Sequence, residues 1–192
     1  MKYNKLTKKK AYHQVKKQVP TNEEIIKLKE LFNKDNIYSI DECYFSEKIL
    51  PNYGYCIKGQ RLNTQTKPKN WKKRSLLMAI SKNGNYIYRI INGSINSIIF
   101  KEFCDLLQNN NLIMDNVSFH KKYKDNRYNF IPCYSPEYNP IEYIFSKIKN
   151  SFRKLNFLNT NIEKSISESI NNINKDDIIN CFSHVNKLLN NI

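Results

Sequence analysis

The feature that most constrains the fold is the stretch from Leu112 to Glu142, in which two different elements each carry an acidic residue. It opens with a short apolar run, Leu112-Ile113-Met114, followed by Asp115, which is typical of a buried strand with a carboxylate at its tip. It closes with Asn139-Pro140-Ile141-Glu142, where an N-cap residue and a proline at the first helical position predict a helix start. The question is whether these carboxylates share a metal site.

A third acidic position lies upstream, in the β-rich segment from Asn36 to Phe45. Asp41 and Glu42 are in its middle, and on a strand their side chains point to opposite faces. A buried aspartate costs roughly several kcal/mol unless it is paired or bound to a metal. An exposed face of an edge strand is the alternative, and the segment alone leaves the two interpretations even.

The remaining segments predict an α/β fold with a mixed sheet flanked by helices. Strands are expected at 36–45, 75–81 and 86–91, with a hairpin turn at 82–85 and a further strand from Leu112. Helices are expected after Thr21, over 96–107, from Pro140, and in two amphipathic segments near the C-terminus. An antiparallel meander followed by alternating helices and strands is typical of such a sheet.

The net charge of +15 favours a polyanion as partner, with nucleic acid first. The sequence is rich in Asn, Lys and Ile, so the alternative is that many lysines are only solvated surface. The distribution favours a functional surface, because 14 of the 15 charges fall in residues 1–20 and 58–74, which contain no acid. A short strand is also expected at 53–57.

Several classes of protein are excluded by composition. The five cysteines are scattered and the three histidines are dispersed, which argues for reduced thiols and against a structural zinc site. The four glycines are isolated, so no phosphate-binding loop is present. No apolar run is long enough to span a membrane, and the first twenty residues are too polar for a secretory signal. We therefore expect an intracellular protein without a membrane partner.

The remaining candidate constellation is Asp41, Asp115 and Glu142. Hard carboxylate oxygens suit Mg²⁺ or Mn²⁺, and two such ions about 4 Å apart can promote phosphodiester displacement. Each acid also has a structural alternative: Glu142 could form a capping box with Asn139 or favour the helix dipole, and Asp115 could belong to an ordinary turn. Taken together and in this order, the three acids favour a metal site.

Three blocks of this sequence resemble, in order, the signature motifs of the DDE transposases, most closely the mariner-like group and its bacterial insertion-sequence relatives. The blocks are Ser39-Ile40-Asp41-Glu42, Met114-Asp115-Asn116-x-x-x-His120 and Tyr134-Ser135-Pro136-x-x-Asn139-Pro140-Ile141-Glu142. The resemblance implies an RNase H-like fold with a mixed five-stranded sheet, in which Asp41, Asp115 and Glu142 bind two divalent ions. It also implies hydrolytic nicking at transposon ends, attack of the freed 3′-hydroxyl on target DNA, and a dimer or larger assembly.

The resemblance extends to DNA contacts. Lys58-Gly59-Gln60-Arg61 looks like the family's loop after the first strand, and His120 matches a recurrent histidine for which a local hydrogen bond and a DNA contact are both open. The other basic candidates lie in the same loop or on one face of the helix from Pro140: Lys67, Lys69, Lys72, Lys73, Arg74, Lys149 and Arg153.

The sequence departs from the family in two places. The spacer 116–141 is shorter than usual by roughly two helical turns, so the helix before the fifth strand is expected to be clipped, for example to residues 121–127, or absent. The family's N-terminal helix-turn-helix region cannot fit before the first strand, so we expect it on another polypeptide, or the chain to be a truncated or repurposed remnant. Glu137 is a rival third ligand, but a helix holds Glu142 more rigidly.

We therefore expect a basic lead-in with one helix over residues 1–35 and an RNase H-like DDE catalytic domain over residues 36–192. The expected function is metal-dependent cleavage and strand transfer of DNA, at a location inside the cell where DNA is present. The alternatives are a catalytically impaired DNA-binding remnant and an RNase H-like nuclease with another substrate.

Overall fold

The computed structural model describes residues 19–46, 73–118, 120–158 and 161–191. The basic lead-in, the strand expected at 53–57 and most of the basic segment 58–74 lie outside these ranges.

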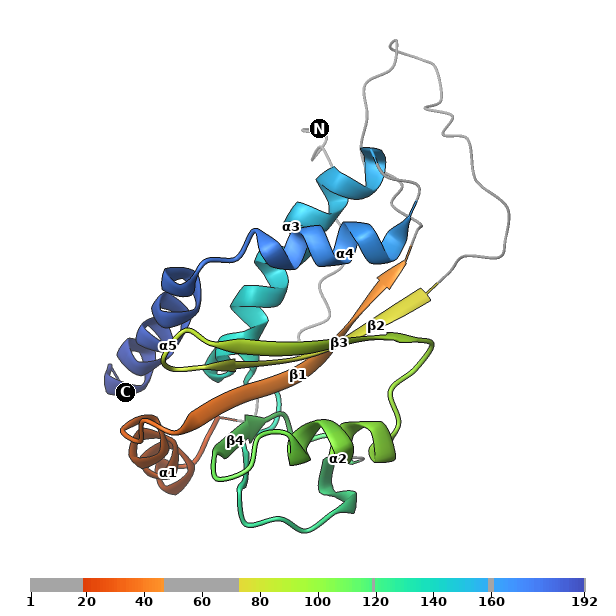
Figure 1. Ribbon diagram of the computed structural model, residues 1–192. Coiled ribbons are helices and arrows are strands. Elements are labelled where there is room, and N and C mark those ends of the chain that lie inside the picture. The colour runs from red at the N-terminus through yellow and green to blue at the C-terminus, as the bar shows by residue number, and fades with distance from the viewer. Residues whose placement is uncertain (1–18, 47–72, 119, 159–160, 192) are drawn as a thin grey trace, which may run out of the picture.

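The described residues form a five-stranded mixed sheet in the order β3-β2-β1-β4-β5 (Figure 1). The strands are β1 (Ile37–Ser46), β2 (Lys73–Ser81), β3 (Tyr86–Asn92), β4 (Asn111–Met114) and β5 (Tyr128–Phe130). β1, β2 and β3 pair antiparallel, whereas β4 pairs parallel with both β1 and β5. The predicted mixed sheet is therefore confirmed. Because β1 lies at its centre, the edge-strand alternative for Asp41 is wrong.

The β2–β3 hairpin forms where the sequence predicts it. Gly84 adopts a φ of +84°, which a glycine accommodates without the steric cost of a side chain. The hydrogen bond from Ser81 N to Asn85 O, 2.8 Å long, closes the turn. At its other end β2 begins earlier than expected, because Lys73 and Arg74 pair with β1 and so are strand residues rather than part of a basic loop.

Helices cover both faces of the sheet (Figure 1). One face packs against α2 (Ser97–Asp105), and the other packs against α1 (Asn22–Phe32), α3 (Pro140–Leu158), α4 (Ile162–Asn171) and α5 (Lys175–Asn190). Helix α1 begins after Thr21 as predicted, and Thr21 and Glu24 form a capping box there. The Phe32 and Phe182 ring centroids are 6.1 Å apart, so α1 shares the core of α5 and belongs to the packed body.

Helix α3 fixes one side of the candidate site. Its predicted apolar stripe is buried and consists of Ile141, Ile144, Phe145, Ile148 and Phe152. Burial of such a side chain contributes about 1.5–3 kcal/mol relative to exposure, before the loss of conformational entropy. The ring of Phe152 meets that of Phe45 edge-on with centroids 4.7 Å apart, so α3 is anchored directly to β1.

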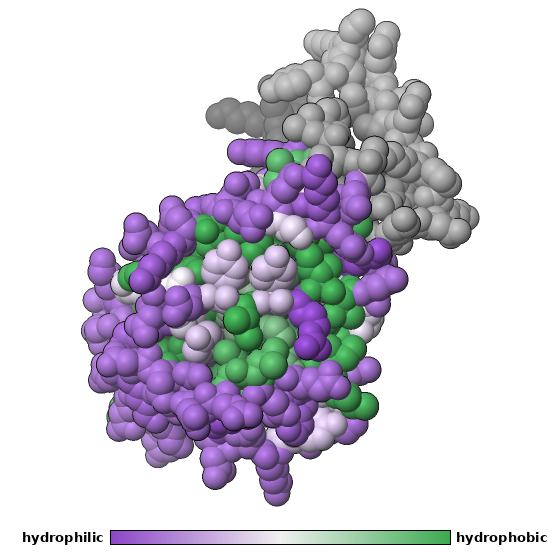
Figure 2. Space-filling view, viewed as in Figure 1, coloured by the Kyte–Doolittle hydropathy of each residue, from purple (hydrophilic) through white to green (hydrophobic). Residues whose placement is uncertain are grey.

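The face seen in Figure 2 gathers apolar side chains at its centre, within a rim of hydrophilic residues. Edge strand β3 is half-exposed along its length, and Tyr88 is 38% exposed. Its one charged residue, Arg89, lies 3.5 Å from Glu102 of α2, and a charge on an edge strand disfavours pairing with another chain. In the described part of the chain, no helix combines the length and apolarity that crossing a membrane requires.

Candidate metal centre

The topology brings the three predicted acids together at the C-terminal end of β4, beside the central strand β1. Parallel strands β1 and β4 are aligned with Ile37 opposite Asn111 and Ser39 opposite Ile113. Continued by two residues, this register places Asp41 level with Asp115, which directly follows β4. Glu142 lies in the first turn of α3, the helix packed on β1.

Electrostatic coupling also indicates that the three carboxylates are neighbours. Asp41 is 7% exposed, and this burial, together with the charges of Glu42, Asp115 and Glu142, raises its pKa to about 8. Burial likewise raises the pKa of Glu142, with Asp115 adding to the rise and Lys149 opposing it. Clustered hard-oxygen donors that disfavour one another's charge are the donor set that a divalent cation would stabilise.

In the ranges that the structure describes, no three Asp, Glu, His or Cys side chains converge closely enough to hold a metal ion. The predicted ligands lie near one another, but the two aspartates contact protein groups: Asp41 the amide of Asn139 and Asp115 the imidazole of His120. The donor types fit Mg²⁺ or Mn²⁺, and binding would require these carboxylates to turn toward the ion.

Asp41 is held by a buried polar chain. Asn139 Nδ2 donates to Asp41 Oδ2 over 3.4 Å, and Asn139 Oδ1 accepts a hydrogen bond of 2.5 Å from Ser39 Oγ. Ser39 Oγ in turn accepts from the Ile141 backbone N–H over 3.2 Å. Helix α3 begins at Pro140 as predicted, so Asn139 occupies the N-cap position. Its side chain, however, binds β1, and the hydroxyl of Ser39 caps the helix from across the interface.

Asp115 is held by His120, whose side chain is buried. Nδ1 lies 2.7 Å from Asp115 Oδ1, and Nε2 lies 3.3 Å from Glu42 Oε2. The imidazole stacks on Phe100 of α2, with the ring centroids 4.1 Å apart. Burial opposes protonation, but the contacts with both carboxylates outweigh it and raise the pKa of His120 to about 9. A buried imidazole cannot reach DNA, so the DNA contact considered for His120 is wrong and the local role remains.

Of the two structural alternatives for Glu142, its place in the first turn of α3 fits the helix dipole, whereas the capping box is not observed. Its backbone N–H donates to the backbone oxygen of Asn139, while Asn139 N–H donates to Pro136 O, so the reciprocal bonds of a capping box are not formed. The rival Glu137 lies in the 3₁₀ turn η2 (Pro136–Tyr138). Glu142 lines the pocket described next and Glu137 does not, which favours Glu142 as the third ligand.

A pocket of about 360 Å³ opens beside the acids, with Asp115, Asn139 and Glu142 in its wall. Asp41 lies behind the pocket wall and is hydrogen-bonded to Asn139, which is part of that wall. At the rim, Tyr134 is 68% exposed and has a φ of +58°, a conformation that is uncommon for a residue other than glycine. Such outliers occur preferentially at functional sites and ligand clamps.

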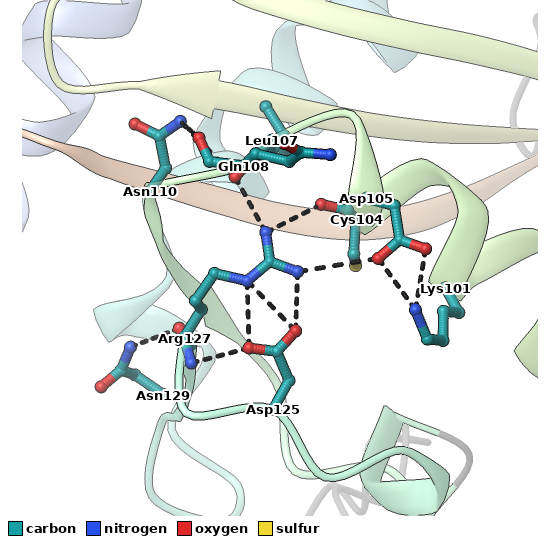
Figure 3. Close-up of polar contacts among 9 residues, drawn as sticks. All are labelled: Lys101, Cys104, Asp105, Leu107, Gln108, Asn110, Asp125, Arg127 and Asn129. Atoms are coloured by element: carbon teal, nitrogen blue, oxygen red, sulfur yellow. Dashed lines mark hydrogen bonds and ion pairs between the residues drawn. The ribbon is translucent and has the colours of Figure 1, made fainter.

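The short spacer after β4 is fixed without the usual helix. The helix expected to be clipped, for example to residues 121–127, or absent, is reduced in the described part of the spacer to a 3₁₀ turn, η1 (His120–Lys122). Figure 3 shows the Arg127 guanidinium directed at the end of α2, where Nη1 donates to Cys104 O and Leu107 O. The same group pairs with Asp125, with Nη2 2.6 Å from Oδ2. These bonds of the Arg127 guanidinium, called the Arg127 fork below, hold the spacer against α2.

The predicted DNA-binding cations fall into three groups. Lys58, Arg61, Lys67, Lys69 and Lys72 lie outside the described residues. Arg74 is tied to α4 by an ion pair with Glu163, 2.6 Å from Nε to Oε1. Lys73 and Arg153 are exposed, and Lys149 is half-buried beside Phe145. DNA contact by these cations remains a prediction.

Sequence reasoning gave no role to Ser39 and Glu42, which contact the groups that hold the acids, nor to Tyr134 at the pocket rim or Arg127 in the spacer. A signal existed for Ser39, because it alternates with Asp41 along a strand whose other residues on that face are apolar. The pairing of Glu42 with His120 joins residues distant in sequence, so no local pattern indicates it.

A family model described as a DDE superfamily endonuclease matches residues 36–163. No curated protein matches the chain. Among solved structures, the Mos1 strand transfer complex is 12% identical with a TM-score of 0.61, covering 95% of this chain and 64% of that one. The Mos1 mariner paired end complex with Mn is 13% identical with a TM-score of 0.60, covering 96% and 66%.

The catalytic domain of Mos1 mariner transposase is 10% identical with a TM-score of 0.55, covering 90% of this chain and 93% of that domain. This chain thus spans about two thirds of the transposase chains in the complexes and nearly all of the isolated domain. At these identities the likeness concerns the fold, which is RNase H-like as expected.

Proposed function

Because the chain belongs to the DDE superfamily endonucleases, whose family model covers residues 36–163, we propose that it is a transposase catalytic domain that cleaves and joins DNA using divalent metal ions. The observation that carries the proposal is the register of β1 and β4, which sets Asp41 level with Asp115 beneath the first turn of α3. That arrangement presents three carboxylates at the C-terminal end of β4, beside an open pocket.

In this proposal Asp41, Asp115 and Glu142 hold the ions. Mg²⁺ or Mn²⁺, when bound, activates the attacking oxygen and stabilises the leaving oxygen in phosphodiester displacement. The use of these metals is supported by the oxygen donor set and by the Mos1 complexes described with Mn and with Mg. The protein groups orient the acids: His120 braces Asp115, and Asn139 braces Asp41.

The pocket is the proposed entry for the DNA strand. Its exposed rim residue Tyr134 offers an aromatic face for a nucleobase, and base stacking on such a face does not depend on sequence. Exposed Lys73 and Arg153 supply positive charge for the phosphate backbone. Because related complexes contain paired ends, we propose that two copies act together on DNA ends and target.

A nicking assay on supercoiled plasmid tests the proposed function. The wild-type chain is expected to nick with Mg²⁺ or Mn²⁺ and not with EDTA, whereas Asp115→Asn loses activity by at least about 10³-fold. Glu137→Gln, which changes a neighbouring acid outside the pocket wall, is the matched control and retains activity. Equal nicking by wild type and Asp115→Asn would contradict the proposal. DNA binding without metal-dependent turnover would indicate the impaired remnant instead.

A further inference from the structure

The face of β1 that packs against α3 carries two buried polar side chains among apolar ones. Ile37, Cys43 and Phe45 on this face belong to the core shared with α3. Ser39 and Asp41 alternate with them and are 0% and 7% exposed. A buried polar group without a partner destabilises the fold, so the partners of these two residues indicate what they contribute.

The partners form one directed chain of hydrogen bonds. It starts at the Ile141 N–H in the first turn of α3, which donates to Ser39 Oγ over 3.2 Å. Ser39 Oγ then donates to Asn139 Oδ1 over 2.5 Å, and Asn139 Nδ2 donates to Asp41 Oδ2 over 3.4 Å. Every donor points toward the Asp41 carboxylate. In a buried setting such linked bonds polarise and strengthen one another.

The two ends of this chain are the two sides of the candidate centre. One end is Asp41 itself, and the other is the backbone of Ile141, the residue directly before Glu142. The hydroxyl of Ser39 therefore bonds the first turn of α3 to β1, beside the bond from Asn139 to Asp41. Asp41 and Glu142 lie on the two elements that these bonds join, so the bonds help to set the distance between their carboxylates.

We propose that Ser39 and Asn139 are positioning residues that hold Asp41 and Glu142 at the spacing a shared metal ion requires. This inference rests on the proposed function. Groups that brace a metal ligand fix its orientation, and their removal typically costs about 10–100-fold in metal affinity. Asn139 also lies in the pocket wall, so it holds Asp41 directly behind the surface that the substrate would meet.

The test measures Mn²⁺ binding by the whole chain without DNA, from the electron paramagnetic resonance signal of free Mn²⁺. Ser39→Ala is expected to raise the Kd for Mn²⁺ about 10–100-fold, whereas Ser39→Thr, which keeps the hydroxyl, stays near the wild type. The matched control is Ser169→Ala. It removes another buried hydroxyl, one that donates to Ser165 O within α4, and it leaves the Kd unchanged.

Thermal unfolding in EDTA shows whether the effect of Ser39→Ala on Mn²⁺ binding is only a consequence of a less stable fold. Ser39→Ala and Ser169→Ala each delete one buried hydroxyl, so similar losses of Tm with different Kd values support the proposal. If Ser39→Ala does not fold, Asn139→Ala replaces it, since water from the pocket can fill the space left there. Equal Kd values for wild type, Asn139→Ala and Ser39→Ala would overturn the inference alone. Failure of the wild type to bind Mn²⁺ would overturn the proposed function and this inference together.

Discussion

At the scale of single residues, each candidate ligand has a partner that the fold supplies. Asp41 is buried at the centre of the sheet and accepts from Asn139, while Asp115 is braced by a histidine that also contacts Glu42. These partners come from segments far apart in the chain, so each acid is oriented by tertiary structure rather than by its own loop. Two predictions concern these residues.

The first is the pH dependence of stability without metal. The pKa of Asp41 is about 8 in the folded protein, whereas its ordinary value is 3.8. Between pH 3.8 and about pH 8, the folded state therefore binds this proton more tightly than the unfolded state does. The free energy of unfolding therefore falls as pH rises from about 4 to 8. Urea denaturation of the EDTA-treated wild type should show this fall, and Asp41→Asn should show a smaller one. The same pH dependence in both proteins would rule out Asp41 as its source.

The second concerns His120. His120→Ala removes a fully buried ring stacked on Phe100 and leaves Glu42 and Asp115 without the cation between them. We expect a loss of about 2–4 kcal/mol in the free energy of unfolding, measured by urea denaturation near neutral pH. His184→Ala, at an exposed position on α5, is the control and should cost well under about 1 kcal/mol. Losses of equal size would show that the imidazole has no bracing role.

At the scale of elements, most of the sheet and its helices follow from local patterns. Apolar runs bounded by turn residues indicate β2, β3 and β4, and 3.6-residue periodicity indicates α3 and α5. Local rules place the start of α3 correctly but not the bond that caps it, because the Asn139 side chain binds Ser39 and the Ser39 hydroxyl accepts from the helix. The path of the spacer likewise depends on Arg127 reaching α2, which no local pattern encodes.

The spacer itself supports a prediction. Arg127→Ala removes the Arg127 fork that joins residues 115–130 to the end of α2, so amide hydrogen exchange should accelerate across that segment. Lys101→Ala breaks the exposed ion pair with Asp105 in the same network and should leave exchange there nearly unchanged, since such pairs contribute little. Unchanged exchange in Arg127→Ala would mean that other contacts hold the spacer.

At the scale of the whole molecule, the net charge could be predicted from the sequence, whereas the positions of the free charges depend on the fold. The charge of +15 is a property of composition and was available from the sequence, as were the three acids and the class of fold. The sequence could not show which cations remain available for DNA, because the ion pair of Arg74 with Glu163 joins β2 to α4 across the fold. The carboxylate cluster depends equally on the β1–β4 register.

Measurements of DNA affinity test whether exposed cations such as Arg153 contact DNA and ion-paired cations such as Arg74 do not. Arg153→Ala removes an exposed charge on α3, so DNA binding should weaken for all sequences and the slope of log K against log salt should fall by about 0.9. Arg74→Ala should mainly lower the free energy of unfolding, because the guanidinium of Arg74 bonds both Asn92 and Glu163. Fluorescence anisotropy over a salt series, with urea denaturation of both variants, makes the comparison. A larger salt effect for Arg74→Ala than for Arg153→Ala would reverse the assignment.

The most direct measurement of the central claim, that Asp41, Asp115 and Glu142 form one metal centre, is anomalous X-ray scattering from crystals of the chain grown with Mn²⁺. The expected result is an anomalous peak between the three carboxylates at the C-terminal end of β4, with Asp41 and Asp115 turned toward it and the peak absent in Asp115→Asn. A wild-type crystal with Mn²⁺ bound elsewhere, or with these carboxylates still turned away from any ion, would contradict the claim.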